Sequence, residues 1–433
     1  MMNKKLNGTV LISAYACCPG RGSEPGYGWN YLLQYAGTFR KVILVTSRQD
    51  HVAVGDKLRE MGITNVTIKV ATLRFGLNRL HYIPVGGIHI HYLLWLRQAF
   101  SVINSLTEEI DFAHHVTFGS LQFGSPLYRL KCPFVFGPVG GGQRTNRIFY
   151  PMMSRKARVF ETIRNGVSYL FYRFNPFFKG TIRHASLIYC VNVETRDEAR
   201  RFLPQTEHHR IRMMLDTSLD ERFLADPVIR EKTGTRFSAL WVGRLLPRKG
   251  VEILLNTAKL LRDENFELIM VGDGPLKEKT LAFIRDHQLE DTIKFLGWVD
   301  QRNIRQYYRS ADIMLFLSYR DSSGTQIMEA FSQGVPVISF DQFGASLMIN
   351  EEVGVKVPLG EDLDALQERT ADSIRALIQH PDRVRTMSAN ALVFASRFTW
   401  ENKMAAILKD IKPLLTDIKT LVYENADLRL ERV

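Results

Sequence analysis

The chain has 433 residues, of which 45% are hydrophobic and 24% are charged. This length suits two domains of roughly 200 residues better than one core, and the composition excludes an intrinsically disordered protein. No apolar run reaches the ~18 residues that span a bilayer, so we expect a protein that is not integral to the membrane.

The net charge of +12 is unevenly distributed along the chain. Residues 1–215 hold 28 Lys and Arg against 12 Asp and Glu, a balance of +16, whereas the remainder holds 29 against 33, a balance of −4. A basic half predicts an anionic partner such as nucleic acid, membrane headgroups or an acidic small molecule. Charge that serves only solubility is the alternative.

The N-terminal stretch MMNKKLNGTVLISAYACC imitates a signal peptide. Its apolar patch is short and the residues before Cys17 form a poor cleavage site, so we expect a first buried strand instead. The four cysteines, Cys17, Cys18, Cys132 and Cys190, have neither metal-ligand nor disulfide-framework spacing. We therefore expect packed thiols in a reducing cytoplasm.

Six strands are expected in the first half: TVLISA, KVILVTS, VTIKV, DFAHHV, PFVFG and SLIYCV. Two long excursions between them, residues 73–100 and 144–184, mix Arg and Lys with aromatic and aliphatic residues. This composition is typical of helices at an anionic membrane surface, and core helices with solvated Arg faces are the alternative. Single-stranded nucleic acid is disfavoured because no known binding module is recognisable.

The second half repeats a unit of one apolar strand followed by one helix. The expected strands are FSALWVGRL, FELIMVG, TIKFLG, DIMLFLS, PVISF and GVKVP. Helical spacing of apolar residues follows the first strand, and further helices are expected over 276–287, 301–310 and 325–333. Apolar strands separated by helices indicate a parallel sheet covered on both faces, which is a doubly wound α/β domain.

The first half has the same pattern with longer insertions, so we expect two such domains. The N-terminal domain would comprise residues 1–215 and the C-terminal domain residues 216–399, with the tail 400–433 packing back on the first domain. Ligands of open parallel sheets bind at the carboxyl ends of the strands, so the two domains are expected to face one cleft.

Two strand-helix turns of the second half suit a phosphate ligand. VGRLLPRKGVE places Arg244 and Lys249 beside a helix N-terminus, and cations together with free N–H groups suit a diphosphate. A basic surface loop is the alternative. VGDGPLKE places Gly272 and Gly274 in the next turn, where glycine lets a ligand approach the backbone, although this signal is weak by itself.

The third turn, RDSSGTQIMEAFSQGVPVISF, carries two carboxylates around a helix start. Asp321 and Glu329 bracket the N–H groups of Gly324 and Thr325, with one of the two serines as the expected helix cap. Carboxylates accept hydroxyl hydrogens, so the expected partner is a polyol. Asp321 could alternatively be a cap, whereas Glu329 has apolar neighbours among which an unpaired charge would be costly.

In this order and spacing, VGRLLPRKG, VGDGP, FLGW and RDSSGTQIMEAFSQGVPVI resemble the nucleotide-sugar domain of the retaining glycosyltransferases of family four. GSEPGYGWNY and FVFGPVGGGQ resemble a bacterial branch of that family involved in surface polysaccharides. The resemblance covers nearly the whole chain. It implies the α/β GT-B fold, in which two doubly wound, Rossmann-like domains face a central cleft.

The resemblance implies roles for individual residues. Arg244 and Lys249 would hold the donor diphosphate and stabilise it as leaving group. Glu329, the second acid of the family's Glu-x7-Glu pattern, would bind ribose hydroxyls, and Asp321 takes the place of the first acid, where a shorter side chain leaves the donor sugar open. Donor contacts are also implied for Gly22, Gly26, Gly28, Gly272, Gly274, Gly324 and Thr325.

The strand DFAHHVTFGS occupies the place of the family strand that carries a histidine facing the reacting sugar. Alternation along a strand puts His114 and His115 on opposite faces, so only one of them fits this place. We favour His115, and the other would be a core histidine with satisfied hydrogen bonds.

The resemblance implies a metal-independent, hexosyltransferase-type enzyme that transfers a sugar from a nucleotide diphosphate-sugar with retention. Asp362 and Asp364 are expected to begin a helix rather than to bind a metal, and no cofactor is expected. The expected acceptor is a lipid-linked saccharide of capsule, O-antigen or exopolysaccharide synthesis, at the inner face of the cell membrane. The alternatives are a nucleotide-sugar 2-epimerase and a non-enzymatic protein that binds membrane or nucleic acid.

Overall fold

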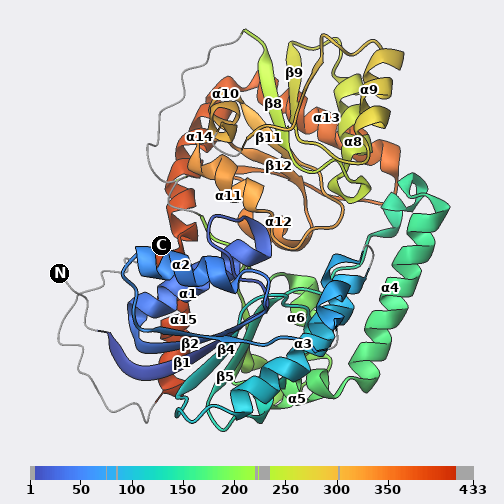
Figure 1. Ribbon diagram of the computed structural model, residues 1–433. Coiled ribbons are helices and arrows are strands. Elements are labelled where there is room, and N and C mark those ends of the chain that lie inside the picture. The colour runs from blue at the N-terminus through green and yellow to red at the C-terminus, as the bar shows by residue number, and fades with distance from the viewer. Residues whose placement is uncertain are drawn as a thin grey trace.

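The computed structural model describes residues 5–74, 76–83, 86–219, 223, 235–300 and 303–415. Two α/β domains lie one above the other, the first being the lower one in Figure 1. Each is built on one sheet in which every strand pairing is parallel. The predicted doubly wound α/β fold is confirmed.

The first sheet has seven strands in the order β3-β2-β1-β4-β5-β6-β7. All six predicted strands are present, and the short β7 was not predicted. The strands are β1 Leu6–Ala14, β2 Phe39–Thr46, β3 Val66–Val70, β4 Phe112–His115, β5 Phe134–Val139, β6 Leu187–Cys190 and β7 Ile211–Met213. The helices are α1 Ser23–Thr38, α2 His51–Glu60, α3 Gly87–Asn104, α4 Arg155–Phe174, α5 Pro176–His184 and α6 Val193–Arg200.

Alternation along β1 divides the core of the first domain into two layers. Leu11 faces the layer of α3 and α5, whereas Val10 and Ile12 face the layer of α1 and α2. Both faces are apolar because helices cover both, as the continuous hydrophobic strands predicted.

The second sheet has six strands in the order β10-β9-β8-β11-β12-β13, and each of them was predicted. The strands are β8 Phe237–Val242, β9 Phe266–Val271, β10 Ile293–Gly297, β11 Ile313–Phe316, β12 Val337–Phe340 and β13 Gly354–Val357. The helices are α8 Val251–Leu260, α9 Lys277–Asp286, α10 Ile304–Ser310, α11 Thr325–Ser332, α12 Phe343–Met348, α13 Leu363–Gln379 and α14 Pro381–Ala395. Asp362 caps α13 by accepting a hydrogen bond from the N–H of Ala365 at 2.7 Å, so the predicted helix start is confirmed.

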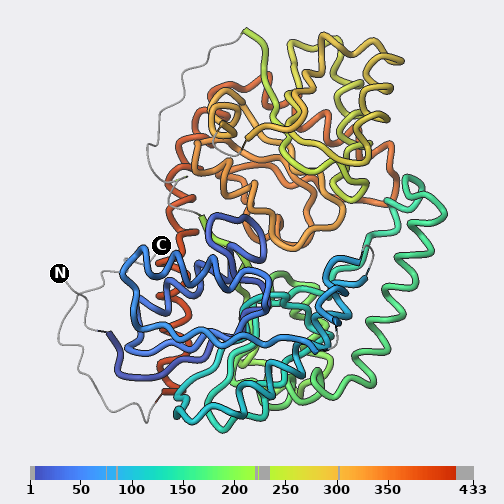
Figure 2. Tube along the Cα trace, viewed as in Figure 1, coloured from blue at the N-terminus to red at the C-terminus, as the bar shows by residue number. Residues whose placement is uncertain are grey.

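The chain returns to the first domain through α15, Trp400–Ile411, the red helix that runs down the lower domain in Figures 1 and 2. Its buried face, Trp400 to Ile411, packs in the same core layer as α1. The two chain segments that connect the domains are hydrogen-bonded to each other, since Leu219 donates its N–H to the carbonyl of Phe398 at 2.7 Å. Residues 416–433 of the predicted tail lie outside the described residues.

A segment of the first domain is anchored in the core of the second. The 3-10 helix Arg147–Met152 places Ile148 and Phe149 in the hydrophobic cluster that covers β8 and α8. The ring of Phe149 stacks on Tyr319 at 5.0 Å between ring centroids. Apolar packing therefore joins the domains on the side opposite to the covalent crossings.

The two aromatic-basic excursions have different environments. α3 buries Tyr92, Trp95 and Leu96 completely, so this helix of the first excursion packs in the core. The segment before it is more open, with Tyr82 at 75% and Ile83 at 50% exposure. α4 leaves a row of large apolar side chains in solvent, including Phe160 at 53%, Tyr169 at 67% and Phe174 at 67% exposure. No helix in the described ranges is both long and apolar enough to cross a membrane.

Candidate active site

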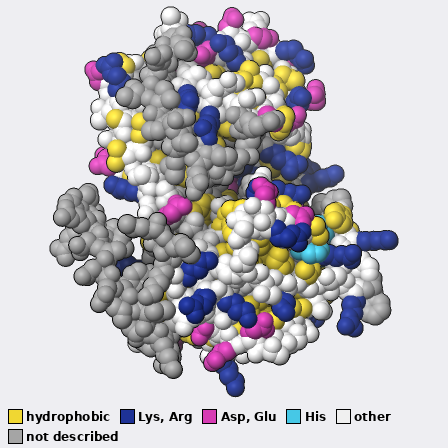
Figure 3. All heavy atoms as spheres, turned by 60° about the vertical axis from the view of Figure 1, so that its left-hand side comes forward, with side chains coloured by type: hydrophobic (Ala, Val, Ile, Leu, Met, Phe, Trp, Pro, Cys, Tyr) yellow, Lys and Arg dark blue, Asp and Glu magenta, His cyan; other side chains and the backbone are white. Residues whose placement is uncertain are grey.

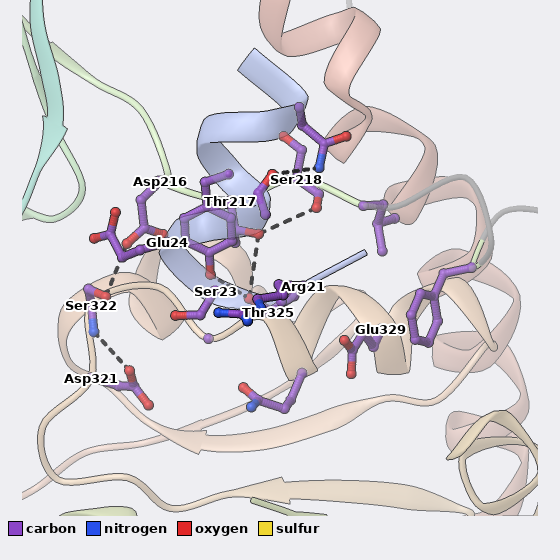
Figure 4. Close-up of a pocket in the computed structure, with 18 of the residues that line it drawn as sticks. Arg21, Ser23, Glu24, Asp216, Thr217, Ser218, Asp321, Ser322, Thr325 and Glu329 are labelled. Atoms are coloured by element: carbon purple, nitrogen blue, oxygen red, sulfur yellow. Dashed lines mark hydrogen bonds between the residues drawn. The ribbon is translucent and has the colours of Figure 1, made fainter. Parts of the chain in front are cut away.

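A cavity of about 380 Å³ lies between the domains, at the carboxyl ends of β1 and β11 (Figure 4). Parallel sheets bind ligands at this edge, and here both sheets contribute. It brings together predicted residues from three separate turns: Gly22, Gly26, Lys249, Asp321, Gly324, Thr325 and Glu329.

The turn after β8 supplies two cations to the cavity. The Lys249 ammonium pairs with the Asp321 carboxylate, and the Nη1 of Arg248 lies 3.7 Å from the same carboxylate. The Lys249 side chain is 12% exposed and its Nζ lies 5.5 Å from the centre of the Phe316 ring. Asp321, the first acid of the pair, thus forms an ion pair with Lys249, the cation that we expect to bind phosphate.

The start of α11 forms the centre of the second-domain wall. Gly324 has φ +96°, and a Cβ there would lie 2.7 Å from the Phe316 ring, so this position requires glycine. The predicted serine cap is wrong, because Gly324 is the N-cap residue and the Oγ of Ser322 donates to Asp216 at 3.1 Å. A helix start without a side-chain cap leaves its N–H groups available to a ligand.

The second acid of the pair lies one turn further along α11. Glu329 lines the cavity and accepts a hydrogen bond from the buried hydroxyl of Tyr308 at 2.9 Å. Asp321 and Glu329 lie on opposite sides of Thr325 in Figure 4. The two carboxylates therefore bracket the helix start, as the spacing of eight residues predicts.

The wall of the first domain is the glycine-rich loop and the first turns of α1. A Cβ on Gly26 would lie 2.0 Å from the carbonyl oxygen of Arg21, so this glycine lets the loop fold over the helix. Gly22 is the N-cap residue of α1 and lines the cavity. Gly28 does not line the cavity: a Cβ there would lie 2.2 Å from the carbonyl oxygen of Ala16, so it serves packing.

Glu24 is a cavity residue that sequence reasoning missed. Its Oε2 accepts a hydrogen bond from the N–H of Phe118 at 2.8 Å. Burial raises the pKa of Glu24 to about 7, the Phe118 bond lowers it and Asp216 raises it further. A carboxyl that titrates near neutral pH limits the negative charge of a cavity that must accept an anion.

Besides Gly28, three predicted donor residues do not line the cavity. A Cβ on Gly272 would lie 1.8 Å from the carbonyl oxygen of Gly243, and one on Gly274 would lie 2.7 Å from that of Leu245. Both glycines let the turn after β9 pack against the turn after β8. The side chain of Arg244 is exposed and does not line the cavity, which Arg248 lines instead.

Neither histidine reaches the cavity. His114 contacts the hydroxyl of Tyr35 and the carbonyl of Gly137, both at 2.7 Å. His115 contacts the hydroxyls of Tyr92 at 2.8 Å and Ser13 at 3.1 Å. Burial lowers the pKa of both rings to about 3, so both are neutral core histidines in this arrangement. The geometry gives no support to a catalytic role for His115 or His114.

The linker between the domains also faces the cavity, through Asp216 to Leu219. Lys403 of α15 fixes this linker by donating to the carbonyls of Leu215 at 2.8 Å and Thr217 at 2.6 Å. Burial lowers the pKa of Lys403 to about 7, although Asp216 opposes this shift. No motif marks these residues, because their place depends on how the two domains meet.

Tyr27 and Arg248 complete the site and could have been found from the sequence. The hydroxyl of Tyr27, inside the glycine-rich motif, lies 3.1 Å from the Oγ1 of Thr325 across the domain boundary. Arg248 directly precedes Lys249 in the predicted phosphate turn. Within the described ranges, no three His, Cys, Asp or Glu side chains are grouped as metal ligands would be.

Residues 225–393 match the family model of the glycosyl transferases group 1. The match lies within the second domain. Among curated relatives, D-inositol 3-phosphate glycosyltransferase 2 of Catenulispora acidiphila is 29% identical over 198 residues, 43% of this chain and 45% of the relative. The amylovoran biosynthesis glycosyltransferase AmsK of Erwinia amylovora is 31% identical over 131 residues, 28% of this chain and 32% of the relative. The chain thus spans less than half the length of these relatives.

Solved structures match over nearly the whole chain and establish the fold. Sucrose-phosphate synthase of Thermosynechococcus elongatus has a TM-score of 0.64 at 18% identity, covering 94% of this chain and 99% of its own. WaaG, described as a glycosyltransferase of lipopolysaccharide biosynthesis, has a TM-score of 0.59 at 15% identity, covering 92% and 99%. The chain has the predicted GT-B fold.

Proposed function

We propose that the protein is a retaining glycosyltransferase that transfers a hexose from a nucleotide diphosphate-sugar to an acceptor hydroxyl. One observation carries this proposal: Lys249, the open start of α11 and Glu329 line the same cavity as the glycine-rich loop of the other domain. Cations, free N–H groups and a carboxylate are the groups that a diphosphate and a ribose require.

Each wall has its own role in the proposed reaction. Lys249 and Arg248 would neutralise the charge that develops on the leaving diphosphate, which is the main catalytic device in a closed cleft without a metal. Arg244 has no place in this proposal, because its side chain lies outside the cavity. Glu329, oriented by Tyr308, would accept the ribose hydroxyls. Asp321 would exchange its contact with Lys249 for one with the sugar.

We further propose a lipid-linked saccharide as acceptor, in the synthesis of a surface polysaccharide at the cytoplasmic face of the membrane. The relative AmsK, by its name, acts in amylovoran biosynthesis. The basic first domain, the lower one in Figure 3, shows Lys and Arg side chains on its surface and suits an anionic acceptor. No cofactor enters this proposal.

The outer face of α4 supports peripheral contact with anionic lipid. Its exposed apolar residues recur at spacings of three and four and so form one stripe: Phe160, Ile163, Val167, Leu170 and Phe174. Between residues 144 and 183 the chain has nine Lys and Arg and a single acid, Glu161. Glu161 is buried and paired with Arg164 and with Arg320 at 2.7 Å, so no carboxylate faces outward from α4. An apolar stripe flanked by cations is the form of an interfacial helix.

Thermal unfolding with a panel of nucleoside diphosphates and their sugar conjugates tests the donor site. A ligand at 100 times its dissociation constant stabilises the folded state by about 2.7 kcal/mol, which raises the melting temperature measurably. We expect one conjugate to stabilise the wild type and the Glu329→Ala variant to lose that shift. The best conjugate would name the sugar, and release of free nucleoside diphosphate on addition of acceptor would establish transfer.

Glu252→Ala is the matched control, because Glu252 is a carboxylate on α8 that does not line the cavity. Its shift should equal that of the wild type. A panel without any stabilising conjugate would refute the donor site. Conversion of the donor to an epimer in the absence of an acceptor would show that the enzyme is a nucleotide-sugar 2-epimerase and not a transferase.

A further inference from the structure

A second cavity lies in the first domain, away from the cleft between the domains. It has a volume of about 710 Å³ and is formed by α4, α5 and the end of α6. None of its lining residues lines the first cavity. We call it the α4–α5 groove.

The floor of the α4–α5 groove is aromatic. Phe178 and Tyr172 are buried, and their rings lie 5.0 Å apart. Phe202 packs on both, at 4.9 Å from Phe178 and 5.4 Å from Tyr172, and is itself 41% exposed. Three rings, from α4, α5 and the turn after α6, thus make a preformed apolar surface that is open to solvent.

The rim of the α4–α5 groove is cationic. Arg144, Arg173, Lys179 and Arg183 are exposed, and none of them forms an ion pair with any residue that the structure describes. The fifth cation, Arg201, is paired with Glu198 at 2.8 Å, and Glu198 is the one acid of the lining. Five cations against one carboxylate leave the groove strongly positive, and a surface cation that serves only solubility would not need to converge on an aromatic floor.

We propose that the α4–α5 groove binds the phosphate of an amphiphile, that is, a phosphate or diphosphate ester that carries a hydrocarbon chain. The cations would take the phosphate oxygens, as Arg and Lys do in anion sites, and the rings would cover the first carbons of the chain. A free phosphate would leave the aromatic floor unused, and a neutral lipid would leave the rim unused.

The α4–α5 groove and the exposed stripe share one helix, α4. Tyr169, which lines the groove, is 67% exposed and directly precedes Leu170 of the stripe. An amphiphile held by its phosphate would leave the groove beside this helix, whose stripe we propose to contact lipid. This part of the inference rests on the proposed function, because two sources share the chemistry: a phospholipid of the membrane and the prenyl diphosphate of a lipid-linked acceptor.

Calorimetric titration of the full chain distinguishes the sources. The probes are geranyl diphosphate and dihexanoyl phosphatidylglycerol, with inorganic pyrophosphate as the probe that lacks a chain. The groove variant is Arg173→Gln/Lys179→Gln/Arg183→Gln. The control variant removes the same charge from the second domain, Lys259→Gln/Arg285→Gln/Arg383→Gln, at exposed positions on α8, α9 and α14.

We expect at least one chain-bearing probe to bind, the groove variant to weaken it tenfold or more, and the control variant to change it less than twofold. Tighter binding of geranyl diphosphate assigns the groove to the acceptor, and tighter binding of phosphatidylglycerol assigns it to the membrane. Phe202→Ser, at an exposed position, should weaken the chain-bearing probes and leave pyrophosphate unaffected.

Equal affinity for pyrophosphate and geranyl diphosphate would overturn the proposal, as would wild-type affinity of the groove variant. Competition of both probes by a single-stranded oligonucleotide at equal strength would assign the groove to nucleic acid instead. The nucleotide-sugar shift in the cleft is measured on the same variants. If no nucleotide-sugar shifts the melting temperature of the wild type but a chain-bearing probe still binds, the proposed function is refuted and the proposal for the groove is retained.

Discussion

The two domains share a parallel sheet of nearly the same strand order but differ in what connects the strands. In the second domain each strand from β8 to β12 is followed by a turn and one α-helix, and its turns supply the ion-paired Lys249 and Asp321 to the cavity. In the first domain long insertions separate β3 from β4 and β5 from β6, and its wall supplies the half-buried Glu24. The shared sheets set the place of the cleft, whereas the insertions give the first domain its own surfaces.

The two insertions of the first domain also differ from each other. The excursions 73–100 and 144–184 both mix aromatic and basic residues, yet their helices differ. α3 has a single Arg or Lys, Arg97, and packs in the core, whereas α4 has five and leaves an apolar face in solvent. The mixture of residue types in an excursion therefore does not show which of its apolar residues pack against the sheet.

The largest expected effect comes from a truncation in α3. Trp95→Ala removes a completely buried ring from the core layer of α3 and should lower the free energy of unfolding by about 3–5 kcal/mol. Phe160→Ala on α4 should change it by less than about 0.5 kcal/mol, because that ring is already half in solvent. Urea denaturation measures both, and equal losses would contradict the distinction between the two helices.

A smaller effect is expected from the two predicted cations of the second domain, which the structure separates. Lys249→Ala should weaken binding of the nucleoside diphosphate by about 2 kcal/mol, roughly 30-fold, since a charge-assisted contact is lost. Arg244→Ala should change it less than about threefold, because the exposed Arg244 lies outside the cavity. Titration calorimetry at one ionic strength compares them, and the reverse order would place Arg244 in the donor site.

The smallest of the three effects concerns the wall of the first domain. The folded pKa of Glu24, about 7, lies above its ordinary value of 4.5. Between these two pH values, the folded protein keeps a proton on Glu24 that the unfolded chain has lost. The contribution of this proton to the free energy of unfolding is therefore fully present below pH 4.5 and is lost as the pH rises through 7. Glu24→Gln should exceed the wild type in stability by about 2 kcal/mol or less at pH 8 and match it near pH 4.5. A constant difference between pH 4.5 and 8 would show that Glu24 is ionised throughout.

The sequence predicts the sheets better than the site. Continuous apolar strands such as Ile313–Phe316 depend on local pattern, so each predicted strand is found. The acids of α11 are also predicted correctly as a pair, since a helix fixes their spacing. Asp216 and Thr217 of the linker reach the cavity only because two separate domains meet there.

The two histidines, in contrast, were predicted in the site, and the structure places them in the core. Position on β4 brings His114 and His115 near the correct sheet edge, but neither sequence nor resemblance shows that Tyr35 and Tyr92 already occupy their ring nitrogens. Likewise, the close approach of two turns requires Gly272 and Gly274. The sequence alone does not distinguish a glycine required by packing from one that faces a ligand.

The anchoring of Phe149 in the second domain limits how this chain could be divided. Ile148 and Phe149 complete the hydrophobic cluster over β8. A fragment that begins after the first domain would lack both residues, and its Tyr319 and Phe340 would lose the ring of Phe149 that covers them. Such a fragment would expose an apolar socket and tend to aggregate. The two domains are therefore joined twice, by the chain segments that cross between them and by this apolar anchor.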